Sequence, residues 1–152
     1  SGRRQRQMCI RDSDDCPVFR FDYRIEKITS LDGQEEKETF ELKGKRLLLS
    51  SGIANPQSFS QLLKLEEGCP VAEMRFEDHH NYSESSIRKM IEQGNNTPHD
   101  FWLTTEKDAV KLKSFQQQLK QLWVVKMKIQ PDPEWPAFFN RFLDGLSKTS
   151  LN

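Results

Sequence analysis

The sequence predicts an α/β protein with a mostly parallel sheet flanked by helices, a Rossmann-like three-layer arrangement, preceded by a two-stranded antiparallel ribbon. After Gly44, short apolar runs of strand type alternate strictly with amphipathic stretches of helical type. Successive strand-helix units require right-handed crossovers, which make the strands parallel. The length of 152 residues suits one core of ordinary size.

Composition excludes several classes of protein. Hydrophobic residues make up 35% and charged residues 30%, and ten Phe with three Trp supply the large side chains of a folded core. The 23 Lys and Arg are balanced by 23 Asp and Glu, so no positive field favours nucleic acid. Three cysteines without a CxxC predict neither a disulfide framework nor a zinc site. No apolar run approaches the ~18 residues of a membrane span, and no signal peptide is visible, so we expect a soluble chain.

The segment boundaries are predicted from changes in texture. Residues 1–13 are basic and aperiodic and are expected to be a non-native or disordered leader, and 148–152 a tail. Residues 14–43 are expected to form the ribbon, with strands at Val18–Ile25 and Thr39–Leu42, and to pack either on the following domain or on a missing preceding one. Residues 44–147 are expected to form the α/β carboxy-terminal domain.

The α/β elements follow in order. A buried strand is expected at 46–50, a helix from Pro56 to Leu65 closed by Gly68, and a second strand at 71–76. The next helix begins at Ser83 and Glu84 and ends at 94–96. A strand at 101–104, a helical stretch from 105 to 122 broken near 113–114, and a strand at 123–129 complete the sheet. A last amphipathic helix is expected to turn inward Phe138, Phe139, Phe142, Leu143 and Leu146.

Three loops follow the strands, at 51–56, 77–82 and 104–108. Because the carboxyl ends of parallel strands share one edge, their polar side chains are expected to converge there. Each loop also has a plain structural interpretation: a tight turn, a solvated histidine pair and a helix N-cap, respectively. In the second loop, Asp78 precedes His79 and His80, and a carboxylate beside an imidazole is an arrangement used in general base catalysis.

Taken together, the loops resemble a known family. The strings Leu-Ser-Ser-Gly-Ile-Ala-Asn-Pro (49–56), Phe-Glu-Asp-His-His-Asn-Tyr-Ser (76–83) and Leu-Thr-Thr-Glu-Lys-Asp-Ala-Val-Lys-Leu (103–112) are similar to the carboxy-terminal half of the tetraacyldisaccharide 4′-kinases, the lipid A 4′-kinases. The resemblance runs from about Val18 to Leu146. It implies two α/β domains joined by a two-stranded ribbon, so that residues 14–43 would link this domain to a missing amino-terminal domain.

The resemblance also implies a reaction. Such a kinase transfers the γ-phosphate of ATP to the 4′-hydroxyl of tetraacyldisaccharide 1-phosphate, a step of lipid A and lipopolysaccharide biosynthesis at the cytoplasmic face of the inner membrane of Gram-negative bacteria. The implied partners are the lipid A disaccharide precursor, ATP and, through the missing half, a membrane surface. The sequence contains no G-x-x-x-x-G-K-[ST] phosphate loop, so ATP and Mg²⁺ are expected to be bound mainly by the missing domain and this chain alone to be inactive.

Site residues are carried over by motif. His79 matches the family's catalytic histidine, which works with a carboxylate of the amino-terminal domain, and Asp78 is expected to hold it. Lys107 is expected to neutralise phosphate charge. The supporting or substrate-cleft residues are Asp78, His80, Thr105, Glu106, Lys107 and Asp108, and no metal ligand is expected in this chain.

Two alternatives remain from the sequence. Asp78-His79-His80 also resembles the motif of the DHH-type metal phosphoesterases, although no DxD motif precedes it. The absent phosphate loop is compatible with a stand-alone α/β binding module. A metal titration would test the first alternative, and the upstream coding sequence the second.

Overall fold

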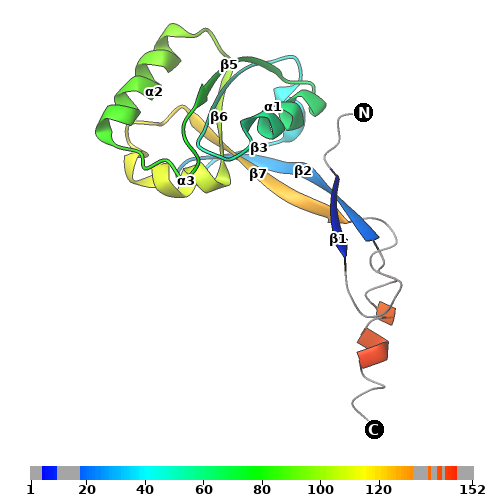
Figure 1. Ribbon diagram of the computed structural model, residues 1–152. Helices are drawn as coiled ribbons and strands as arrows, with labels where there is room; N and C mark the ends of the chain where they lie inside the picture. Colours follow the sequence, from blue (N-terminus) through cyan, green and yellow to red (C-terminus); the bar gives the residue numbers. More distant parts are fainter. Residues whose placement is uncertain (1–4, 10–17, 132–136, 138–139, 142, 147–152) are drawn as a thin grey trace. The chain divides into compact units, whose positions relative to one another are not determined.

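The computed structural model describes residues 5–9, 18–131, 137, 140–141 and 143–146 (Figure 1). Residue contacts divide the chain into two units. One contains residues 24–128, and the other contains residues 4–23 and 129–152. Where the natural sequence begins, and the domain boundaries predicted from the sequence, stay predictions.

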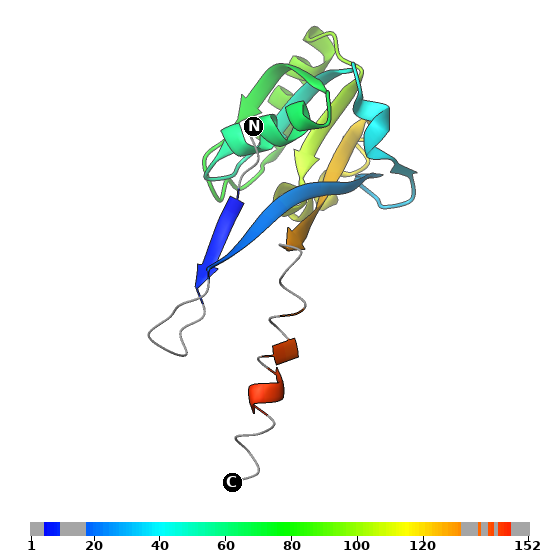
Figure 2. The ribbon, with the colours of Figure 1, turned by 90° about the vertical axis from the view of Figure 1, so that its right-hand side faces the viewer.

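A mixed sheet runs through the described part of the chain. Its strands are β1 (Gln5–Cys9), β2 (Val18–Ser30), β3 (Glu36–Lys37), β4 (Arg46–Ser51), β5 (Cys69–Arg75), β6 (Phe101–Thr105) and β7 (Leu122–Pro131). Their order is β1-β2-β7-β6-β4-β5, with β3 paired to β2, and Figures 1 and 2 show β2 beside β7. β4 pairs in parallel with β5 and β6, and β6 with β7, whereas β1 is antiparallel to β2. The predicted fold class is confirmed.

Each main helix begins where the sequence places a capping residue. The helices are α1 (Pro56–Leu65), α2 (Glu84–Asn96) and α3 (Glu106–Leu112), preceded by Asn55, Ser83 and Thr105. These side chains accept hydrogen bonds from the N–H of the third helical residue, which satisfies a backbone donor that the helix leaves free. Beyond α1, the Gly68 N–H donates to the Leu63 carbonyl over 3.1 Å and closes that helix.

The core lies on both faces of the sheet. Leu47 and Leu49 of β4 pack with the α1 side chains Phe59 and Leu63. Leu48, between them, points to the opposite face and packs with residues of α2 and α3, among them Ile87, Met90 and Leu112. Figure 1 shows α1 on one side of β4 and β6, and α2 with α3 on the other. The three layers predicted from the sequence are therefore present.

The strand order creates a switch point at β4. β5 lies on one side of β4 and β6 on the other, so the chain reverses its direction of winding between α1 and α2. In open α/β sheets, the crevice for ligands lies beyond the carboxyl ends of the strands that flank such a reversal. The loops after β4 and β6 occupy this position.

Three local expectations are wrong. Thr39–Leu42 form a short 3-10 helix, η1, with a hydrogen bond from the Glu38 N–H to Glu41 Oε2 at 2.8 Å, whereas β1 and β3 do pair antiparallel with β2. The helical stretch after 105 breaks at residue 113 as predicted, but it continues only as a second 3-10 turn, η2 (Lys113–Phe115), and Leu122 already belongs to β7. Leu143 and Leu146, expected to face inward, are 46% and 52% exposed. Phe138, Phe139 and Phe142 lie outside the described residues.

Candidate functional site

The three loops that follow β4, β5 and β6 meet at the carboxyl edge of the sheet, as the sequence predicts. The backbone N–H of Gly52, just after β4, donates a 3.0 Å hydrogen bond to Oδ1 of Asp108 in α3. The hydroxyl of Tyr82, in the loop after β5, donates to the same oxygen over 2.8 Å. Asp108 therefore joins all three loops.

Asp108 is a buried carboxylate with 2% of its surface exposed. Its Oδ2 accepts a 2.6 Å hydrogen bond from the hydroxyl of Thr105, whose oxygen in turn accepts from the Asp108 N–H at 3.2 Å. Burial of a carboxylate is costly unless protein donors replace its water. Here three neutral donors from three different segments replace the water. The carboxylate is therefore stabilised by the loops, and it in turn holds the loops together.

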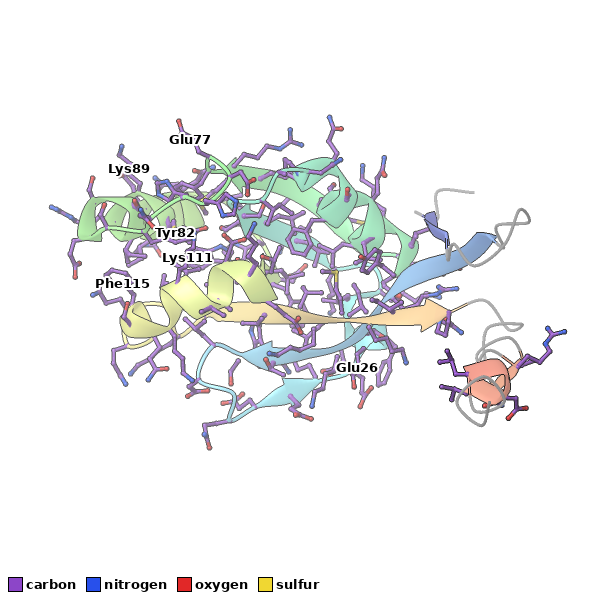
Figure 3. All side chains as sticks on the ribbon, turned by 60° about the horizontal axis from the view of Figure 1, so that its bottom comes forward. Glu26, Glu77, Tyr82, Lys89, Lys111 and Phe115 are labelled. Carbon is purple, nitrogen blue, oxygen red and sulfur yellow. The ribbon has the colours of Figure 1, made fainter. Side chains whose placement is uncertain are left out.

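Tyr82 is half-buried and remains a hydroxyl donor over the ordinary pH range. Burial raises the pKa of its phenol well above the usual value, and the nearby Asp108 carboxylate raises it further. The ring meets the Phe76 ring edge-on at 5.3 Å and the His80 ring at 4.9 Å. Figure 3 shows Tyr82 and Lys111 between α2 and α3, whereas Glu77 lies at the periphery.

His80 is held on several sides. Its ring stacks on Phe76 at 4.7 Å, and its Nε2 lies 3.1 Å from the hydroxyl of Ser86. Its carbonyl oxygen accepts a 3.0 Å hydrogen bond from Nζ of Lys111. His80 is thus anchored in the loop rather than presented to solvent.

His79 points the other way. Its side chain is 75% exposed and its backbone is left-handed, with φ of 60°. Non-glycine residues in this conformation are uncommon and are concentrated at functional sites. Its Nε2 lies 3.6 Å from Oδ2 of Asp78, a distance that suits an ion pair but is longer than a hydrogen bond, and the role of Asp78 in holding the ring stays a prediction.

Asp78 also contacts Lys107 through its other carboxylate oxygen. Nζ of Lys107 donates to Oδ1 of Asp78 over 3.2 Å, and this hydrogen bond is the main cause that lowers the pKa of the Asp78 carboxyl. Glu106 lies apart from this group, 3.9 Å from Nζ of Lys126. The sequence-predicted residues therefore form an exposed set, Asp78, His79 and Lys107, above an anchored set, His80, Thr105 and Asp108.

With this geometry in place, comparison with known proteins decides the family. The family model described as "Tetraacyldisaccharide-1-P 4'-kinase" matches residues 1–146. The chain belongs to this family. The matched range includes all three loops, so the resemblance seen in the sequence is confirmed.

Curated tetraacyldisaccharide 4'-kinases agree with the family match. The kinase of Bdellovibrio bacteriovorus is 29% identical over 112 residues, which are 74% of this chain and 33% of that protein. The kinase of Gluconobacter oxydans is 33% identical over 110 residues, 72% of this chain and 32% of that protein. The chain thus spans about a third of the length of these relatives.

A solved structure shares the fold. The crystal structure of LpxK from Aquifex aeolicus, an "apo" form in complex with ATP, matches with a TM-score of 0.53 and 22% identity. The match covers 84% of this chain and 36% of the Aquifex aeolicus chain.

Among the described residues of this tetraacyldisaccharide-1-P 4'-kinase family member, no group of three or more His, Cys, Asp and Glu side chains is arranged to hold a metal ion. In the same part of the chain, no helix has both the length and the apolar content needed to cross a bilayer.

Tyr82, Gly52 and Ser86 of this family member are not predicted as site residues by the sequence. Tyr82 had a usable signal, since an aromatic hydroxyl directly before a helix cap is a natural hydrogen-bond donor. A Cβ on Gly52 would lie 3.0 Å from the Glu77 carbonyl and 3.2 Å from Asp108 Oδ1, a closeness that only the folded structure reveals.

Proposed function

We propose that this chain is the carboxy-terminal part of a tetraacyldisaccharide 4′-kinase of lipid A biosynthesis. The reaction transfers the γ-phosphate of ATP to the 4′-hydroxyl of tetraacyldisaccharide 1-phosphate. The observation that carries the proposal is the family match over residues 1–146, which includes every loop at the switch point. The exposed His79 above an anchored loop supports it.

The reaction defines what His79 has to do. The 4′-oxygen forms a bond to the γ-phosphorus, the bond from that phosphorus to the β–γ bridging oxygen breaks, and ADP leaves. The hydroxyl proton passes to a base, which we assign to a carboxylate outside this chain. His79 orients or tunes that carboxylate, because an exposed imidazole at the switch-point edge can approach a group supplied by another domain. Lys107, held near the site by Asp78, can contribute positive charge toward the anionic substrate.

ATP and Mg²⁺ are assigned to residues outside this chain. The sequence has no G-x-x-x-x-G-K-[ST] loop, which supplies the phosphate-binding N–H groups and lysine in kinases of this type. The chain alone is therefore expected to transfer no phosphate. In the intact kinase, the membrane contact at the cytoplasmic face of the inner membrane is likewise assigned to the remaining part.

The test joins this chain, in one protein, to the amino-terminal part of the Bdellovibrio bacteriovorus relative. With ATP and tetraacyldisaccharide 1-phosphate, the joined protein is expected to form the 4′-phosphorylated product, and His79→Ala to lower kcat by about a hundredfold or more with little change in the KM for ATP. His79→Gly, which suits the left-handed backbone, separates loss of the imidazole from backbone strain. His99→Ala is the matched control, because His99 bonds the Thr97 carbonyl before β6, at the other end of the strand.

The outcomes separate the alternatives. Equal kcat for His79→Ala and the parent would remove His79 from the reaction. A joined protein that binds the disaccharide but forms no product, while the Bdellovibrio bacteriovorus relative does, would favour a binding module.

A further inference from the structure

One segment at the carboxyl edge of the sheet contains both an exposed imidazole and a hydroxyl that bonds a buried carboxylate. It runs from Phe76 to Tyr82, between β5 and α2. His79, in its middle, is 75% exposed at its side chain. At its end, the Tyr82 hydroxyl donates to Asp108, and next to His79 the His80 ring is packed between Phe76 and Tyr82.

The anchors connect this segment to both neighbouring strands. Asp108 accepts from Tyr82 and from the Gly52 N–H through the same oxygen, so the loops after β4 and β5 share one acceptor. The Thr105 hydroxyl fixes the other carboxylate oxygen at the start of α3. Lys111 of α3 adds a bond to the His80 carbonyl. His79 therefore stands on a backbone whose position is set through Asp108.

The Tyr82 hydroxyl is the group through which the His79 loop itself reaches Asp108, whereas the His80 carbonyl links the same loop to Lys111. If the Tyr82 hydroxyl were removed, Gly52 and Thr105 would still keep Asp108 in place, because each donates its own hydrogen bond to the carboxylate. Without the hydroxyl, the loop would keep its ring contacts and the Lys111 hydrogen bond, but it would lose its direct hydrogen bond to Asp108. A fixed catalytic group that shifts by about 1 Å can lose a large part of its rate effect.

We propose that Tyr82 is a positioning residue for His79, and that it acts by bonding the loop after β5 to the buried Asp108. This inference rests on the proposed kinase function for its rate effect, but not for its effect on the loop. Tyr82 does not touch the reacting atoms. Its hydroxyl fixes where the imidazole can reach.

The test is Tyr82→Phe, which removes the hydroxyl and keeps the ring. Tyr23→Phe is the matched control, because it makes the same change in the other tyrosine of the sequence, in β2. In the joined protein described above, Tyr82→Phe is expected to lower kcat on the order of tenfold, with the KM for ATP unchanged. In the chain itself, amide relaxation by NMR is expected to show increased motion at 77–82 and not in β4 or β6.

A double substitution distinguishes positioning from general weakening. If Tyr82 acts through His79, Tyr82→Phe has no further effect on kcat once His79 is alanine. Multiplicative losses in the double variant, or an unchanged loop in the NMR spectra, would overturn the proposal. If His79→Ala alone leaves kcat unchanged, the role given to His79 fails, and the NMR measurement still decides whether Tyr82 holds the loop.

Discussion

An aspartate lies at each end of β6, and the two carboxylates obtain their hydrogen-bond donors in different ways. Asp100, just before the strand, is exposed and accepts hydrogen bonds from three nitrogens of Arg46. They are the backbone N–H at 2.8 Å, Nε at 3.2 Å and Nη2 at 3.1 Å. Asp108, just after the strand, is buried and accepts from Gly52, Tyr82 and Thr105. Each carboxylate has three donors, but the first is satisfied by a charged partner and water, and the second only by neutral groups from three segments.

The two carboxylates differ in how many segments of the chain they connect. The Arg46 guanidinium and backbone hold the pKa of Asp100 near 2, and this exposed pair links only the starts of β4 and β6. The contacts of Asp108 hold three loops in one arrangement, and any loop that moves leaves a buried charge poorly solvated. At the carboxyl edge, Asp108 thus fixes the relative positions of three loops, whereas at the amino edge Asp100 only connects two strand starts.

The largest expected effect is from Asp108→Ala. It leaves the Gly52 N–H and two hydroxyls without their acceptor in a buried site, so the free energy of unfolding should fall by about 3 kcal/mol. Urea unfolding of the chain measures this loss. Asp100→Ala is the control, and a loss as large as that of Asp108→Ala would show that the two ends do not differ.

Gly52→Ala should rank second. The added Cβ would lie 3.0 Å from the Glu77 carbonyl and 3.3 Å from Cβ of His80, so the loops must separate. Overpacking of this kind costs about 1–3 kcal/mol. Chemical shifts in the 77–82 loop should change along with the unfolding free energy. At Gly44, where an added Cβ has nothing within 4 Å and the φ of 70° is the only obstacle, alanine should leave that loop unchanged.

The third prediction concerns the loss of folding stability at low pH. Because the pKa of Asp100 is lowered to about 2 from 3.8, its contribution to stability is present above pH 4 and is lost as the pH falls through 2. Asp100→Asn should therefore flatten the fall of the unfolding free energy between pH 4 and pH 2. Parallel curves for the parent and the variant would show that the Arg46 pair contributes nothing to folding.

The smallest effect is expected at the exposed pair. Lys107→Gln removes the hydrogen bond that lowers the pKa of Asp78, so this pKa should rise toward its ordinary value. Stability should not change measurably, because both groups are solvent-exposed. Carboxyl NMR titration measures the pKa. If it stays low, another group controls Asp78.

The sequence by itself determined the order of elements from residue 46 onward. Apolar runs of strand length, the caps Asn55, Ser83 and Thr105, and Gly68 are local signals, because each depends on the conformation of a few neighbouring residues. The convergence of the three loops also followed from sequence, since right-handed crossovers give parallel strands with a common carboxyl edge. The family strings directed attention to His79 and Asp108.

Tertiary structure alone decided which of those residues are exposed and which are buried in hydrogen bonds between loops. Thr39–Leu42 alternates like a strand, but Leu42 is buried in the core and the segment closes as a 3-10 turn. Asp78 and Asp108 look equivalent in sequence, yet one is exposed beside Lys107 and the other is buried among donors that lie 26 and 56 residues away. Burial and hydrogen bonding at such separations depend on the packing of whole elements, so no local pattern shows that His79 is presented to solvent while Tyr82 and Asp108 hold its loop in place.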